Sequence, residues 1–422
     1  MIGVDVDENK VAMINAGKSP IYEPGLEDLL KKAIRNGSLR CVTEFDEAVL
    51  GSDITFISVG TPALRNGNVD LRQVKAAARD IGRALKEKRG YHLVVVSSTV
   101  LPGTTESLVQ PIIEKYSEKA FGRDFGLCMN PEFLREGNAI HDFFHPHLIV
   151  IGECDKRSGD KLKDLCRTFL EDRFPSMRVN PPTAELIKYA NNAFLATKIS
   201  LMNTIANICE RIPHVDIVKV ADAIGTDPRI GLRFLRAGIG FGGSCLPKDL
   251  RGLVTFAEAH GYRASLLKAV SEANRNQCQR VFELAKIVLG RLERRRIAIL
   301  GLAFKPGTDD MREAPSRSLI ELFLKARSTI IAYDPIAMKN AKEILPKISY
   351  AESALKCLEN ADCSIVVTEW DEFKSITPED FLSRMRRPVL IDGRRIYDPE
   401  RYATKMHFYA IGLGRHHIGA NR

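Results

Sequence analysis

One stretch of twelve residues, from Gly238 to Asp249, constrains this chain more than any other. It reads Gly-Ile-Gly-Phe-Gly-Gly-Ser-Cys-Leu-Pro-Lys-Asp, and so many glycines exclude a helix or a strand while they permit positive φ and close approach to the backbone. Cys245 follows the glycines, and Asp249 faces the same way as Cys245 if a helix begins here. A cradle, a thiol and a carboxylate in this order are typical of covalent chemistry. The alternative is a tight turn with an inert cysteine, because free cysteines are commonly buried.

The composition describes an ordinary globular protein. The 422 residues are 45% apolar and 27% charged, which predicts two or three domains. The net charge of +9 comes without a long Lys/Arg run and with a single Trp, so a nucleic-acid role is not favoured. An anionic small molecule fits this charge, and so does a merely solvated surface. The longest apolar runs, such as 93–96, are too short to span a membrane. Nine scattered cysteines without a Cys-x-x-Cys pair indicate a reducing compartment, and we expect a cytoplasmic protein.

Strands and helices alternate over the first 180 residues, which predicts an α/β domain with a parallel sheet. Residues 53–59 and 91–96 are expected strands, and each is followed by small polar residues. Gly60 and Thr61 follow the first, and Thr99 lies just beyond the second. Strand ends of this kind bind ligands in α/β sheets, so Thr99 is placed at a crevice. Capping of the next helix is an alternative role for Thr99.

The chain opens with Met-Ile-Gly-Val-Asp-Val-Asp, a short apolar strand that ends in acidic residues. A carboxylate at the end of the second strand of a dinucleotide-binding domain takes the ribose hydroxyls, and Asp5 is the candidate, with Lys10 nearby. The alternative is that Asp5 merely ends the strand or caps a helix. No Gly-x-Gly-x-x-Gly motif precedes this strand, so we expect about thirty residues of a complete unit to be missing. A misassigned start, a damaged gene and a truncation all remain open, and each leaves neighbouring strands with unpaired edges.

A second group of polar residues surrounds the expected domain boundary. Pro181-Pro182 is the best linker signal, and residues 184–211 then show the periodicity of one long helix. Lys188 and Asn192 share a face of that helix and are able to stabilise an oxyanion, although exposed polar residues are the ordinary alternative. Glu132 and Glu136 are four apart and able to face one site, or else they begin a surface helix.

Three histidines at positions 141, 145 and 147 are a weaker signal. Pro146 interrupts them and no fourth ligand is evident, so we expect a loop here rather than a metal site. Further on, residues 296–305, 328–333, 362–368 and 388–392 predict a second, Rossmann-like domain without a full glycine fingerprint. Asp334 ends the second of these strands.

The loop 238–249 resembles the nucleophile loop of the UDP-glucose/GDP-mannose dehydrogenase family. Pro131–Glu136 (Pro-Glu-Phe-Leu-Arg-Glu) resembles another motif of that family, and at least five motifs match in order over nearly the whole chain. The resemblance implies a four-electron oxidation with NAD as cofactor. The C6 alcohol of a nucleotide sugar gives one hydride, Cys245 captures the aldehyde, a second hydride leaves a thioester, and water releases a uronic acid.

The resemblance also assigns roles to individual residues. The implied catalytic residues are Cys245, Lys188, Asn192, Asp249, Glu132 and Thr99. The implied cofactor contacts are Asp5, Lys10, Gly60, Thr61, Thr99, Glu136 and Arg312. The implied substrate contacts are Glu132, Phe133, Leu134, Glu136, Lys188, Asn192, Arg229, Phe241, Gly242, Lys305 and Arg394. Arg395 leaves the choice between the two neighbouring arginines open, and no metal is implied.

The expected organisation has three parts: an NAD-binding domain at 1–180 that lacks its first strand, a central helical domain at 181–285, and a nucleotide-sugar-binding domain at 286–422. Arg229 resembles an arginine that reaches the substrate of a neighbouring subunit, which implies a homodimer. The segments Tyr22–Leu26 and Asp392–Arg394 favour UDP-glucose, whereas Leu246 also occurs in GDP-mannose enzymes. The alternatives are therefore GDP-mannose or another UDP-hexose, or an inactive nucleotide-sugar-binding remnant.

Overall fold

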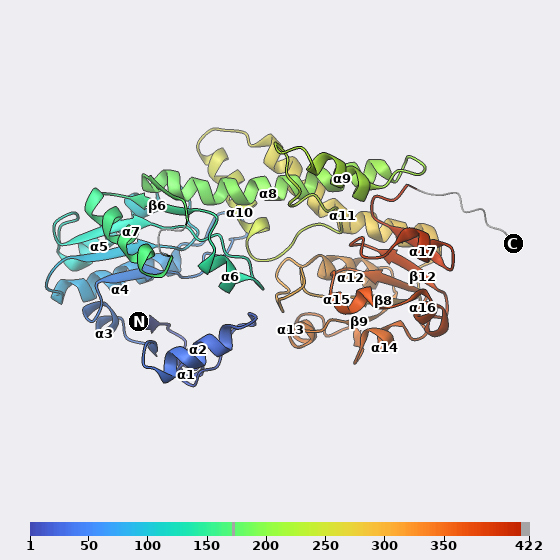
Figure 1. The fold of residues 1–422 in the computed structure, drawn as a ribbon, viewed down its shortest axis with the longest axis horizontal. Helices are drawn as coiled ribbons and strands as arrows, with labels where there is room; N and C mark the ends of the chain where they lie inside the picture. Colours follow the sequence, from blue (N-terminus) through green and yellow to red (C-terminus); the bar gives the residue numbers. More distant parts are fainter. Residues whose placement is uncertain (171–173, 415–422) are drawn as a thin grey trace. The chain divides into compact units, whose positions relative to one another are not determined.

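The computed structural model describes residues 1–170 and 174–414. The chain divides into two compact units, Met1–Asn191 with Arg251–His260, and Asn192–Leu250 with Gly261–Arg422. The long helix α8 (Pro181–Cys209), green in Figure 1, contributes residues to both units, as does α10 (Leu246–Ala259).

The first unit alternates strands with helices, as the sequence predicts. Its strands are β1 (Ile2–Val4), β2 (Arg40–Val42), β3 (Ile54–Ile57), β4 (His92–Val96), β5 (Phe125–Met129), β6 (Ile149–Glu153) and β7 (Ser176–Val179). Its other helices are α1 (Glu8–Asn15), α2 (Leu26–Arg35), α3 (Phe45–Leu50), α4 (Arg72–Glu87), the π-helical turn η1 (Thr105–Val109), α5 (Gln110–Ser117), α6 (Ala139–Phe144) and α7 (Lys156–Leu170).

These strands form two sheets. β3, β4, β5, β6 and β7 lie side by side in this order, and all neighbours are parallel except β5 and β6. β1 and β2 form a separate parallel pair. Within the described residues, β1 has a single partner strand, β2, and β3 has a single partner strand, β4. Both β1 and β3 are therefore edge strands.

The inner strands β4 and β5 of the five-stranded sheet are buried on both faces, which explains why they are continuously apolar. In β4, Val94 and Val96 pack into one core cluster, and Leu93 and Val95 pack into the other. Successive side chains of a strand point to opposite faces, so a single run of apolar residues fills both cores. The sheet therefore fixes where β4 ends and where the following loop, with Thr99, begins.

The second unit contains a helical region and a second sheet. The helical region consists of the rest of α8, α9 (Ile217–Gly225), the start of α10 and α11 (Ser265–Leu289). The strands are β8 (Arg296–Leu300), β9 (Thr329–Tyr333), β10 (Ser349–Tyr350), β11 (Cys363–Val366), β12 (Val389–Asp392) and β13 (His407–Ala410). The remaining helices are α12 (Pro315–Lys325), α13 (Met338–Ile344), α14 (Ala354–Leu358), α15 (Asp371–Lys374), α16 (Pro378–Arg384) and α17 (Pro399–Ala403).

The six strands are all parallel and lie in the order β10-β9-β8-β11-β12-β13. Counted from β8, this is the doubly wound order 3-2-1-4-5-6 of dinucleotide-binding folds. Ile297 and Ile299 of β8 pack into a core shared with the helical region, whereas Ala298 and Leu300 pack into the core on the other face. The helical region is thus continuous with the second sheet through buried apolar side chains.

The predicted α/β fold, with two Rossmann-like parts and one long helix, is confirmed. Two local predictions are wrong. Pro181 and Pro182 are not a linker but the first turn of α8, where a proline costs nothing because the N–H groups of that turn have no helical partner. The histidine segment expected to be a loop includes the short helix α6, which carries His141 and ends before His145. No helix in the described residues is long and apolar enough to cross a membrane.

Candidate active site

The glycine loop leads directly into a helix, as expected. Cys245 is exposed and precedes α10, and the amide of Asp249 donates to the carbonyl oxygen of Cys245 at 2.9 Å. Gly240 and Gly243 have φ of +104° and +83°, a conformation that disfavours any side chain. The thiol therefore sits at a helix N-terminus, where negative charge is stabilised.

Three amide side chains hold this loop, two of them buried (Asn203 and Gln277) and one partly buried (Asn274), and the sequence did not single them out. Asn203 of α8 accepts from the amide of Gly238 at 2.8 Å, and Gln277 of α11 donates to the Gly238 carbonyl at 3.1 Å. Asn274 of α11 accepts from the amide of Phe241 at 2.8 Å and donates to its carbonyl at 3.0 Å. Since glycines supply no side-chain contacts, these amides take over the positioning of the loop. The signal in the sequence that could have identified them is an Asn or Gln at a helix position where the periodicity predicts an apolar residue.

Asp249 is buried and lies in a small polar group next to the loop. It accepts from the side-chain amide of Asn192 at 2.6 Å and from the ammonium of Lys248. Asn192 is also buried. The structure thus brings together two of the predicted catalytic residues, Asn192 and Asp249, in the unit that carries Cys245.

Lys188 precedes Asn192 by one turn of α8 but makes its contacts within the first unit. Its side chain is 5% exposed, and its ammonium donates to the carbonyl oxygen of Glu132 at 2.6 Å and to its carboxylate at 2.9 Å. The other oxygen of that carboxylate accepts from the amide of Leu134 at 2.6 Å. The ammonium also lies 5.4 Å from the ring centre of Phe133. The alternative of a solvent-exposed lysine is therefore wrong.

The segment 130–138 is not a helix, because α6 begins only at Ala139. The argument that Glu132 and Glu136 face one side through helical spacing is therefore wrong, as is the alternative that they begin a helix. Glu132 is instead directed toward Lys188 by the two contacts above. Glu136 is partly buried in the same loop.

Polar residues at the ends of β3 and β4 lie together. Thr61 donates from its hydroxyl to the carbonyl oxygen of Thr99 at 2.8 Å, and Ser98 donates to the carbonyl oxygen of Val59 at 2.8 Å. Gly60 lies in the irregular segment that follows β3, directly before Thr61. Thr99 does not cap the next helix, since η1 begins only at Thr105. These contacts fix Thr99 at the carboxyl edge of the sheet, where α/β folds bind ligands.

Asp5 directly follows β1 and is not a helix cap. Asp7 caps α1 by accepting from the amides of Asn9 and Lys10. Asp5 accepts from the amide of Asp7 at 2.9 Å, and its other oxygen lies 3.8 Å from the ammonium of Lys10. The carboxylate of Asp5 is 40% exposed, so it remains accessible at the end of a parallel strand.

The second unit places Arg394 and Arg395 in different surroundings. Arg394 donates to the carbonyl oxygens of Val367 at 2.7 Å and Gly240 at 3.3 Å, so it contacts the glycine loop. Arg395 is almost fully buried and pairs with Asp216 at 2.8 Å. The geometry favours Arg394 over Arg395 as the arginine that faces a ligand beside the loop.

The other predicted residues of this unit are more open. Arg312 forms a two-pronged pair with Asp310, and its main-chain carbonyl accepts from the amide of Gly243 at 2.9 Å. Arg229 is 87% exposed and pairs with Asp227. Lys305 lies 5.4 Å from the ring centre of Phe304, which itself packs against Gly243. Phe241 and Gly242 are buried within the loop, so they contribute shape rather than charge.

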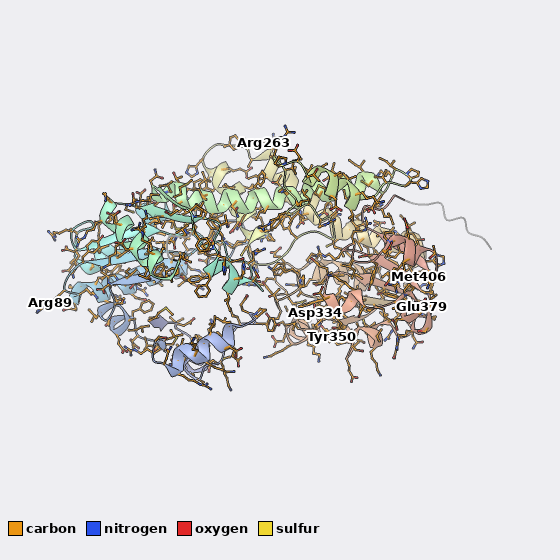
Figure 2. The ribbon with its side chains drawn as sticks, in the orientation of Figure 1. Arg89, Arg263, Asp334, Tyr350, Glu379 and Met406 are labelled. Atoms are coloured by element: carbon orange, nitrogen blue, oxygen red, sulfur yellow. The ribbon has the colours of Figure 1, made fainter. Side chains whose placement is uncertain are left out.

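Asp334 is a further residue of note, at the end of β9 and labelled in Figure 2. It is fully buried and accepts from the amides of Leu302 at 2.8 Å and Ala303 at 3.1 Å, in the turn after β8. In a dinucleotide-binding fold, the amides of that turn hold the pyrophosphate. Here an internal carboxylate occupies them.

Three family profiles match this chain in order. They describe the UDP-glucose/GDP-mannose dehydrogenase family: its NAD binding domain over residues 1–170, its central domain over 182–276 and its UDP binding domain over 298–399. The expected cofactor, NAD, is thereby confirmed.

Individual relatives agree with the profiles. The chain is 44% identical to the UDP-glucose 6-dehydrogenase AglM of Haloferax volcanii, over 94% of this chain and 91% of the relative. It is 41% identical to the GDP-mannose 6-dehydrogenase of Pseudomonas putida, over 93% of each chain. A solved UDP-glucose dehydrogenase from Pyrobaculum islandicum superimposes with a TM-score of 0.91 at 38% identity, over 98% of this chain and 92% of that one. The chain therefore belongs to the UDP-glucose/GDP-mannose dehydrogenase family.

Proposed function

We propose that this protein oxidises the C6 alcohol of a nucleotide sugar twice, with UDP-glucose as substrate and UDP-glucuronate as product. The observation that carries the proposal is the exposed Cys245 at the start of α10, at the end of a glycine loop held by the side-chain amides of two helices. A thiol in this position is accessible for attack on an aldehyde carbon. The hydrogen bonds that fix the loop would hold the sulfur in one place for that attack. The named activities of the relatives support the same reaction class.

The residues around Cys245 suit the covalent steps. The thiolate adds to the aldehyde to give a thiohemiacetal, loss of hydride gives a thioester, and water then releases the carboxylic acid and the thiol. The buried pair of Asn192 and Asp249 provides an amide donor for developing negative charge and a carboxylate for holding a proton. Lys188 and Glu132 provide a second donor and acceptor, 2.9 Å apart, for the deprotonation of the alcohol and for water.

The described residues fit the two ends of NAD. Asp5 presents an accessible carboxylate at a strand end, which suits ribose hydroxyls, and Lys10 lies beside it. Gly60, Thr61 and Thr99 form the polar junction at the ends of β3 and β4, which suits the nicotinamide half. NAD accepts hydride when bound. These residues would hold and orient it, and Arg312 and Glu136 are the remaining proposed contacts.

We assign nucleotide-sugar binding to the part from 286 to 422, with NAD binding in 1–180 and a central helical part in 181–285. The basic side chains Lys305 and Arg394 suit a diphosphate. The segment 131–136, with Phe133 and Leu134, is proposed to contact the sugar. Phe241 and Gly242 are proposed to line the place beside the thiol.

We further propose a homodimer formed along α8. Phe194, Leu201 and Ile208 are exposed and follow one another at intervals of seven residues, which places them on one stripe of the helix. Exposed apolar stripes of this kind mark protein–protein contacts. A second copy is the proposed occupant, and Arg229, exposed on the same unit, would reach its substrate. The nine cysteines are free thiols, which supports the cytoplasm as the compartment.

GDP-mannose is the second candidate substrate, because relatives named for that activity are nearly as similar as those named for UDP-glucose. Another UDP-hexose follows from the same chemistry. Nothing in the fold or in the relatives favours an inactive remnant.

The test is the number of NADH molecules formed per nucleotide sugar. We expect two NADH per UDP-glucose and a lower kcat/KM with GDP-mannose. Cys245→Ser should abolish uronate formation while UDP-glucose binding persists, and Cys41→Ala, which removes a thiol outside the loop, should change neither. Wild-type turnover by Cys245→Ser would refute the covalent role, and a preference for GDP-mannose would reassign the substrate.

A further inference from the structure

Glu185 is a fully buried carboxylate for which the proposed chemistry has no use. It lies in the second turn of α8, three residues before Lys188. One of its oxygens accepts from the amide of Gly103 at 2.5 Å. The other accepts from the amide of Thr105 at 2.8 Å and from the hydroxyl of Thr105 at 2.6 Å. Three donors converge on one buried side chain, and all of them come from the segment after β4.

That segment carries Thr99. It leaves β4 at Val96, passes through Thr99 and enters the π-helical turn η1 at Thr105. Thr61 holds the carbonyl oxygen of Thr99 from the side of β3, and Glu185 holds the far end of the segment from α8. The segment is thus held by hydrogen bonds at both ends. The bonds at its far end come from α8, the helix that also carries Lys188.

Two opposing effects act on the charge of Glu185. A carboxylate at the N-terminus of the helical segment η1–α5 is stabilised by the partial positive charge of the unpaired amides there. Burial raises the pKa of Glu185 to about 7, while the hydrogen bonds from Thr105 and Gly103 oppose that shift. The other titratable groups that face it are Glu106 of η1 and Cys154 after β6. The ionised form accepts all three donors, whereas a protonated oxygen would compete with them.

We propose that Glu185 is a positioning residue that sets the location of Thr99 relative to Lys188, and so aligns the cofactor side of the site with the sugar side. The inference rests on the proposed function for the roles of Thr99 and Lys188. The contacts of Glu185 themselves do not depend on it. A displacement of about 1 Å between reacting groups is enough to slow catalysis by roughly 100-fold, so such a fastening matters for rate.

The experiment compares three single variants at alkaline pH, where Glu185 is ionised. Glu185→Gln keeps the shape of the side chain, but its NH₂ group then faces one of the donor groups of Gly103 or Thr105 where an oxygen had accepted from it. Thr105→Val removes only the hydroxyl bond, and Glu106→Gln is the matched control because Glu106 is exposed on the same turn. We expect Glu185→Gln to lower kcat roughly 10- to 100-fold with little change in KM for UDP-glucose. Thr105→Val should give a smaller loss, and the control should give none.

A second background separates positioning from general damage. If Glu185 acts through Thr99, Glu185→Gln should cause little further loss of kcat in a Thr99→Val protein. An equal fold-loss in both backgrounds, or wild-type kcat in Glu185→Gln, would overturn the proposal. Amide hydrogen exchange gives a readout without turnover: exchange at Gly103 and Thr105 should accelerate in Glu185→Gln, and unchanged protection would overturn the proposal as well. Failure of the wild-type protein to form NADH with any nucleotide sugar would instead refute the proposed function.

Discussion

Replacement of Asp334 by Asn should destabilise the second unit strongly, and the size of the effect follows from its contacts. One carboxylate oxygen accepts from Leu302, Ala303 and the indole N–H of Trp370, at 2.8, 3.1 and 3.0 Å. The other accepts from the amides of Ile336 and Ala337, at 2.9 and 2.8 Å. The side chain is fully buried, so water does not replace any partner that is lost.

Asparagine offers one acceptor oxygen in place of two. Whichever way its amide turns, its NH₂ group faces either the two donors after β9 or the three donors of the other group. At least two buried N–H groups therefore lose their partner, and each such loss costs about 1–3 kcal/mol. We expect Asp334→Asn to lower the free energy of unfolding by roughly 3–5 kcal/mol, which is at the upper end for a single substitution.

The chain supplies its own reporter for this prediction. Trp370 is the single tryptophan and contacts Asp334 directly, so its fluorescence follows urea unfolding of the second unit. Asp371→Asn is the matched control, because that carboxylate is 93% exposed beside Trp370 and pairs only at the surface with Lys374 in the described contacts. The control should shift unfolding by less than about 0.5 kcal/mol. A variant Asp334→Asn that unfolds within the same margin of the wild type would refute the reasoning from buried donors.

Three further predictions concern the rest of the chain. Lys188→Met removes a buried donor and should lower kcat roughly 100- to 1,000-fold in the NADH assay, whereas Lys219→Met, on the exposed side of α9, should not; near-normal kcat would contradict an oxyanion role for Lys188. Leu201→Arg should convert the proposed dimer to monomers in sedimentation velocity, and an unchanged sedimentation coefficient would contradict an interface along α8. Burial raises the pKa of Glu185 to about 7, above its unfolded value near 4.5, so the folded chain holds an extra proton and its stability should fall as pH rises between these values. Glu185→Gln should flatten that slope in thermal melts, and an identical slope would show that Glu185 is not the titrating group.

The sequence predicts the parts of this fold that depend on local pattern. Apolar runs with polar ends give the strands, and the glycine loop followed by Cys245 gives the start of α10, because both signals are contained in a few consecutive residues. Contacts between distant segments are a different matter. Asn203, Asn274 and Gln277 hold the loop from two helices, and nothing in their local sequence shows that their polar groups point toward it. Periodicity predicts which face of a helix is turned inward. The hydrogen-bond partner of an amide side chain on that face depends on the tertiary structure and is not visible in the local sequence.

The two acidic strand ends show most clearly where the sequence stops being informative. Asp5 and Asp334 each follow a short apolar strand that is parallel to its neighbours, and a pattern search treats them alike. In the structure, Asp5 keeps an accessible carboxylate with a single backbone partner, whereas Asp334 is buried and satisfied by five donors. Two of those donors are the amides that a dinucleotide phosphate would need. The same motif thus leaves a place for a ligand in one unit and fills it with the chain's own carboxylate in the other. It follows that the second α/β part should not bind a dinucleotide at its β8 turn, despite its doubly wound strand order, and that a nucleotide bound by this part must contact other groups, of which Lys305 and Arg394 are the proposed ones.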